Sequence, residues 1–120
     1  MRVELSRKYH FSAAHHLPRA PDGHKCRRLH GHSYEIEVAV HGEVDPQTGW
    51  LIDYGAIDEQ VKPLIAELDH RTLNDIPGLE NATSEILCAW LWDRLKDRLQ
   101  GLQRVSVAET CAATCHYFGD

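Results

Sequence analysis

The sequence of 120 residues lacks an excess of positive charge: 13 Lys and Arg residues stand against 18 Asp and Glu residues, giving a net charge of −5. Binding to nucleic acid or to an anionic membrane depends on a basic surplus, so neither is expected as a partner. The chain also lacks any apolar run near the roughly 20 residues that a membrane-spanning helix requires. Its first ten residues, MRVELSRKYH, lack the apolar core of a signal peptide, which predicts a cytoplasmic protein.

Cysteine pairs in a CxxC pattern are absent as well, although four cysteines are present. In a reducing cytoplasm such cysteines are expected to be free thiols. There are no repeats and no linker-like stretches rich in Ser, Pro or Gly, so residues 1–120 are predicted to form one domain. A domain of this size buries about two thirds of its unfolded-chain surface and folds without a metal, so any metal is expected to serve function.

Histidine is unusually frequent, with nine residues against two Phe and three Trp, and the predicted strands decide which histidines can meet. Four segments are predicted as β-strands, the first three from their alternation of apolar and polar side chains. These are residues 3–15, 34–40, 104–109 and 115–118. Trp50 to Ile52, which follows a turn, is predicted as a further short extended run.

Two helices are predicted between the strand pairs. The first has Asp53 as its N-cap and an apolar stripe that ends at Leu68, and Pro63 is expected to kink or split it. The second begins at Thr83 or Ser84 and runs with helical apolar spacing until a glycine stops it at position 101. The order ββααββ, with strands and helices segregated, indicates an α+β fold: a four-stranded antiparallel sheet with two helices on one face.

Strand parity places three histidines on the inward face of the predicted sheet. His15 continues the inward series of the first strand, and His30 and His32 share the parity of Tyr34 in the second. If these strands pair as a hairpin, three imidazoles converge at one end of the sheet, which is the ligand set of a catalytic zinc site with one open position. The alternative is that they are ordinary histidines near the surface at strand ends.

Cys26 lies four residues before His30, in a basic segment that contains Lys25, Arg27 and Arg28. Neighbouring cations lower the pKa of a thiol and favour the reactive thiolate, so Cys26 is a candidate general base or nucleophile. It could equally be a fourth zinc ligand that closes a structural site. The basic side chains are either solvated or contacts for phosphate groups.

Five further positions are candidate functional residues. Asp69 and His70 form an Asp-His pair after the first helix, which by itself is weak evidence for acid–base catalysis. Glu109 shares the inward parity of its strand, where an unpaired carboxylate is costly, so it is expected to have a partner such as an arginine or a ligand with paired N–H donors. Thr83 and Ser84 are helix caps that could also meet a ligand.

Several short segments together resemble the 6-pyruvoyl-tetrahydropterin synthase superfamily, and the resemblance runs nearly end to end. They are Phe11 to His15 (FSAAH), Cys26 with His30-Gly31-His32, Leu68 to His70 (LDH), Leu73 to Asp75 (LND), Asn81 to Glu85 (NATSE) and Glu109-Thr110. The cysteine ahead of HGH and the PGLEN stretch at 77–81 resemble the bacterial branch that forms 6-carboxy-5,6,7,8-tetrahydropterin in queuosine (7-deazaguanine) biosynthesis.

The resemblance implies the tunnelling fold (T-fold) and a homohexamer of two trimers with active sites at subunit interfaces. It implies Zn²⁺ on His15, His30 and His32, with Cys26 as the proton acceptor. Asp69 and His70 would assist it, and a neighbouring subunit could supply them. Glu109 would anchor the pterin ring and could also join the proton relay as a catalytic residue, with Thr83 and Ser84 as further pterin contacts.

The implied substrate is 7,8-dihydroneopterin triphosphate, which would be converted to 6-carboxytetrahydropterin with loss of acetaldehyde and triphosphate. Lys25, Arg27 or Arg28 is expected to hold the triphosphate. Two other functions compete with this prediction. One is the related reaction that eliminates triphosphate and forms 6-pyruvoyltetrahydropterin, and the other is a non-catalytic binding module stabilised by zinc.

Overall fold

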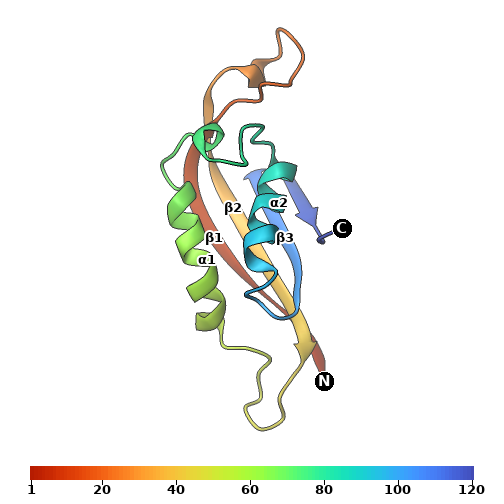
Figure 1. Ribbon diagram of the computed structural model, residues 1–120. Helices are drawn as coiled ribbons and strands as arrows, with labels where there is room; N and C mark the ends of the chain where they lie inside the picture. Colours follow the sequence, from red (N-terminus) through yellow and green to blue (C-terminus); the bar gives the residue numbers. More distant parts are fainter.

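The computed structural model describes residues 1–120 as a four-stranded antiparallel sheet with two helices on one face (Figure 1). The sheet has the order β1-β2-β3-β4. Its elements are β1 (Arg2–His15), β2 (His30–Glu43), α1 (Tyr54–Leu68), α2 (Ser84–Leu95), β3 (Leu102–Thr110) and β4 (Ala113–Tyr117), with single 3₁₀ turns η1 (Lys25–Arg27) and η2 (Leu73–Asp75). The predicted α+β class and the ββααββ order are therefore confirmed.

The hairpin of β1 and β2 is the longest feature of the molecule. Its register is unbroken from Arg2 opposite Glu43 to His15 opposite His30, so the second strand begins earlier than the predicted residue 34. The loop between the strands, residues 16–29, projects beyond the end of the sheet (Figure 1). Because the side chains alternate between two faces, residues of one parity on each strand face the helices and form the core.

Both helices cover the same face of the sheet and close one apolar core. Each is capped by the predicted residue: Asp53 accepts from the backbone N–H of Gly55 at 3.0 Å, and Thr83 from that of Ile86 at 3.1 Å. The buried helix residues, which pack against the inward strand residues, are Ile57, Val61, Leu64, Leu68, Leu87, Cys88, Trp90, Leu91 and Leu95. Neither helix is long and apolar enough to cross a membrane.

Two local predictions were wrong, and so was one of the two alternatives given for Pro63. Pro63 does not split α1, which is continuous from Tyr54 to Leu68, because Pro63 lies on the exposed side where water can bond the carbonyl that its ring leaves free. Helix α2 ends at Leu95, and turns connect it to β3. Trp50 to Ile52 forms no strand, since Leu51 and Ile52 pack against the core from an irregular loop.

Candidate active site

Three histidines meet at the end of the β1–β2 hairpin, as strand parity predicts. His15 lies directly opposite His30, and His32 lies opposite Ala13 one step further into the sheet. The ring centroids are 4.6 Å apart for His15 and His30, 5.1 Å for His15 and His32, and 4.9 Å for His30 and His32. One potential ligand atom from each ring lies within 4.8 Å of the others, which is a spacing that a single ion can bridge.

Hydrogen bonds determine which ring nitrogen is available at two of these histidines. His15 donates from Nδ1 to the Ala82 carbonyl, and His30 donates from Nδ1 to the Arg28 carbonyl, both at 2.7 Å. Each Nε2 therefore carries the free lone pair. The Nε2 atoms of His15 and His32 are buried without any hydrogen-bond partner. Such orphaned nitrogens are costly unless something binds them, and a metal ion fits this donor set.

Burial also keeps His15 neutral. Its side chain is only 1% exposed, and removal from water lowers the pKa of the imidazole below its ordinary value, despite the opposing effects of the Ala82 carbonyl and Glu109. A neutral imidazole is the form that coordinates a metal. Burial favours the neutral ring, and the hydrogen bond from Nδ1 leaves the lone pair on Nε2, so both effects leave His15 Nε2 able to bind a metal ion.

Cys26 lines the same cavity as the histidines. This cavity has a volume of about 440 Å³, and its lining consists of His15, Leu17, Lys25, Cys26, His30, His32 and Glu109. The backbone of Cys26 is tied at both sides, because its N–H donates to His24 Nδ1 at 3.0 Å and its carbonyl accepts from Leu17 N–H at 2.7 Å. The compact group of ligand atoms contains the three histidines without Cys26, which favours a role for the thiol beside the metal site.

Glu109 connects the histidines to a second cavity. Its two carboxylate oxygens lie 3.9 Å from His15 Nε2 and 3.7 Å from His32 Nε2. The same carboxylate accepts a hydrogen bond of 2.9 Å from the Ser84 hydroxyl. Within the chain the partner of this inward carboxylate is a serine and not an arginine, and a ligand with paired N–H donors stays a prediction. The second cavity, of about 370 Å³, is lined by Ser84, Glu85, Glu109, Ala113, Thr114 and Cys115.

The three basic candidates differ in where they lie. Lys25 lines the histidine cavity, whereas Arg27 and Arg28 do not. Arg27 donates to the carbonyls of Pro18 and Ala20 at 3.1 and 2.7 Å, so its guanidinium ties its own loop together. The backbone carbonyl of Arg28 holds His30. Of the three, Lys25 is the one whose position suits an anion bound beside the histidines.

Asp69 and His70 form a pair outside the histidine cavity. Asp69 Oδ1 lies 2.9 Å from His70 Nδ1 and accepts from the backbone N–H of Ser12 at 3.0 Å. That backbone bond is the main cause that lowers the pKa of Asp69, with His70 contributing. His70 has a φ of 58° and a side chain that is 82% exposed. The pair lies beside β1 at the edge of the sheet, and within one chain neither residue lines the cavity that contains Cys26.

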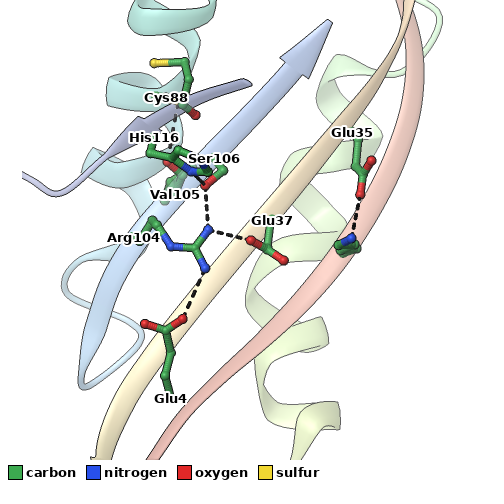
Figure 2. A network of polar contacts seen from close by, with 10 residues as sticks. Glu4, Glu35, Glu37, Cys88, Arg104, Val105, Ser106 and His116 are labelled. Atoms are coloured by element: carbon green, nitrogen blue, oxygen red, sulfur yellow. Dashed lines mark hydrogen bonds and ion pairs between the residues drawn. The ribbon is translucent and has the colours of Figure 1, made fainter. Parts of the chain in front are cut away.

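The face of the sheet opposite the helices carries a polar network that strand alternation alone did not reveal (Figure 2). Arg104 pairs with Glu37 and, at 3.2 Å, with Glu4, and it also donates to Ser106, which contacts His116. The partners come from all four strands, so their proximity follows from the register of pairing. Opposite charges at outward positions of neighbouring strands are the signal that could have predicted this network.

The fold and the site together identify the class of protein to which this chain belongs. The structure of Caenorhabditis elegans 6-pyruvoyl tetrahydropterin synthase superposes with a TM-score of 0.91 at 29% identity, covering 100% of this chain and 97% of that one. The predicted tunnelling fold is therefore confirmed. The family described as 6-pyruvoyl tetrahydropterin synthase matches residues 4–120, and the chain belongs to this family.

Relatives of this chain carry several names within the family. A Synechocystis protein named 6-carboxy-5,6,7,8-tetrahydropterin synthase is 39% identical, over 95% of this chain and 92% of its own. Dihydroneopterin monophosphate aldolase of Pyrococcus furiosus is 33% identical, over 91% of each chain. Human 6-pyruvoyl tetrahydrobiopterin synthase is 32% identical, over 90% of this chain and 86% of its own. The chain is an enzyme of this pterin-processing family, so the alternative of a non-catalytic binding module is wrong.

Proposed function

We propose that this enzyme converts 7,8-dihydroneopterin triphosphate into 6-carboxy-5,6,7,8-tetrahydropterin, with release of acetaldehyde and triphosphate, in queuosine biosynthesis in the cytoplasm. One water molecule supplies the second carboxylate oxygen, because the side-chain carbon that stays on the ring carries only one oxygen in the substrate. The relative named for this product is 39% identical over nearly the whole chain. The observation that carries the proposal is the cavity in which three histidines, Cys26 and Glu109 meet.

Zinc is the metal that we assign to His15, His30 and His32. Three neutral imidazoles with one position left open are its usual catalytic environment. When bound there, the ion supplies a Lewis acid that polarises side-chain oxygens of the substrate and makes the neighbouring C–H bonds more acidic. The hydrogen bonds from His15 and His30 to backbone carbonyls hold two of the rings in the orientation that this role needs.

The remaining site residues are assigned by position. Cys26 accepts the proton from the substrate side chain, because it lines the cavity beside the histidines. Glu109 binds the N–H edge of the pterin ring from the second cavity, with Ser84 holding its carboxylate. Thr83 caps α2 and keeps Ser84 in place. Lys25 contributes most to triphosphate binding, with Arg27 and Arg28 shaping the loop around it.

The position of Asp69 and His70 supports active sites shared between subunits. Both are proposed to assist Cys26, yet neither lines the Cys26 cavity of its own chain. Both lie beside β1, which is an edge strand of the sheet and therefore has backbone groups available for another chain. A homohexamer built from two trimers would bring the pair of one subunit to the cavity of the next.

The decisive experiment is product analysis with the purified enzyme, 7,8-dihydroneopterin triphosphate and zinc. The expected products are 6-carboxytetrahydropterin by mass spectrometry and acetaldehyde by a coupled alcohol dehydrogenase assay. A product that keeps all three side-chain carbons, with no acetaldehyde, would identify the 6-pyruvoyltetrahydropterin reaction instead. To test shared sites, inactive Cys26→Ala and His70→Ala proteins are mixed after dissociation; recovered activity supports sharing, and none refutes it.

A further inference from the structure

Asn74, in the turn η2, uses every hydrogen-bonding group of its side chain. Its Oδ1 accepts from the backbone N–H of His16 at 2.9 Å, and its Nδ2 donates to the backbone carbonyl of the same residue at 2.8 Å. The second hydrogen on Nδ2 points to the carbonyl of Glu80, with a separation of 3.1 Å. The amide thus pairs with His16 as a neighbouring strand would, just where β1 ends.

These contacts join the two segments that hold His15. His16 is the next residue after His15, and Glu80 comes two residues before Ala82, whose carbonyl accepts from His15 Nδ1. Asn74 is the one side chain that hydrogen-bonds to both segments. If either segment shifted, the distance between the imidazole and its carbonyl would change, and Nε2 would turn away from the other two rings.

We propose that Asn74 is a positioning residue of the metal site, which holds His15 in the orientation and tautomer that bind the ion. This inference rests on the zinc site of the proposed function. Groups that orient a ligating histidine typically change metal affinity by about 10- to 100-fold when they are removed. Asn74 makes no hydrogen bond to the His15 imidazole itself. It acts through the backbone segments on both sides of the His15 hydrogen bond.

Two substitutions and a matched control test this role. Asn74→Asp keeps the size and the acceptor for His16 N–H, but it removes both N–H donors and places a carboxylate against two carbonyls. Asn74→Ala removes all three bonds. Asn81→Ala is the control, since Asn81 lies in the same segment and its side chain makes no hydrogen bond in the structure.

The measurements are zinc affinity by competition with a chelator and the visible absorption spectrum of the cobalt-substituted protein. Both Asn74 variants are expected to bind zinc about 10- to 100-fold more weakly and to show an altered cobalt spectrum, while Asn81→Ala matches the wild type. Folded Asn74 variants with wild-type affinity and spectrum would overturn the proposal and leave the zinc site intact. Failure of the wild-type protein to bind zinc would overturn the zinc site and this inference together.

A measurement on the unaltered protein covers the case in which neither variant folds. Coupling between two sites is reciprocal, so zinc should strengthen the contacts of Asn74 if Asn74 strengthens zinc binding. Hydrogen exchange of the Asn74 side-chain amide, followed by NMR, is expected to slow when zinc is added, whereas that of Asn81 stays constant. Equal exchange of the Asn74 amide with and without zinc would contradict the proposal.

Discussion

Replacement of Ser84 by alanine isolates the contact that holds the Glu109 carboxylate. The Ser84 hydroxyl donates to Glu109 at 2.9 Å, and a hydrogen bond to a charged group contributes about 1.5–3 kcal/mol. The Glu109 side chain is 29% exposed, so water can replace part of the lost bond. We therefore expect the lower end, about 1.5 kcal/mol, which corresponds to a roughly tenfold higher KM for the pterin substrate.

The neighbouring residue, Thr83, provides a control for which the expected effect is on stability and less on KM. Thr83 is the N-cap of α2, while Ser84 is the first residue of the helix and caps nothing. Loss of an N-cap hydroxyl costs about 1 kcal/mol of stability. Thr83→Ala should therefore lower the melting temperature and change KM less than Ser84→Ala does. Ser84→Ala should leave the melting temperature close to that of the wild type.

Steady-state kinetics and thermal unfolding of Ser84→Ala and Thr83→Ala are sufficient to test the role of the Ser84 hydroxyl. The reasoning is refuted if Ser84→Ala lowers the melting temperature and leaves KM unchanged, since the hydroxyl would then contribute to folding and not to the carboxylate's position. A Ser84→Thr variant, which keeps the hydroxyl, should restore most of the lost affinity. Absence of this rescue would also count against the proposed contact.

Three further predictions concern the same cavity. Cys26→Ala should keep its zinc content and melting temperature but lose turnover; loss of zinc would instead make Cys26 a ligand. Charge reversal of Lys25, Arg27 and Arg28 together should raise KM for the triphosphate substrate, with Lys25→Glu alone giving most of the change, and an unaltered KM would exclude all three as phosphate contacts. Burial lowers the pKa of His15 below about 6.5, so the unfolded chain binds more protons and the unfolding free energy of the metal-free protein should fall as pH drops through that value. A denaturant midpoint of the metal-free protein that is the same above and below about pH 6.5 would contradict this effect.

The histidine cluster could be predicted from the sequence because it depends on short-range geometry. Alternation along two strands determines which side chains share a face, and a hairpin with regular register brings the strand ends together. The prediction that His15, His30 and His32 lie together depended only on these two conditions. The element order followed for a similar reason, since apolar periodicity and capping residues are local signals.

Errors in the predicted elements came where packing outweighed a local preference. Pro63 is a helix breaker by itself, but on the exposed side of α1 its missing hydrogen bond is replaced by water while the apolar stripe stays buried. The early end of α2 at Leu95 has the same origin, because buried Leu99 contributes to the core from a turn as well as from a helix.

By itself the sequence determined the fold class, the inward face of each main strand and the three imidazoles that share it, because each depends on residues close together in one strand or helix. Only the tertiary structure decided which partner each remaining group received. It paired Glu109 with Ser84, turned Arg27 into its own loop, and kept Asp69 and His70 away from the Cys26 cavity of the same chain. These contacts join segments far apart in the chain, so they depend on how the helices and loops pack against the sheet and not on any local pattern.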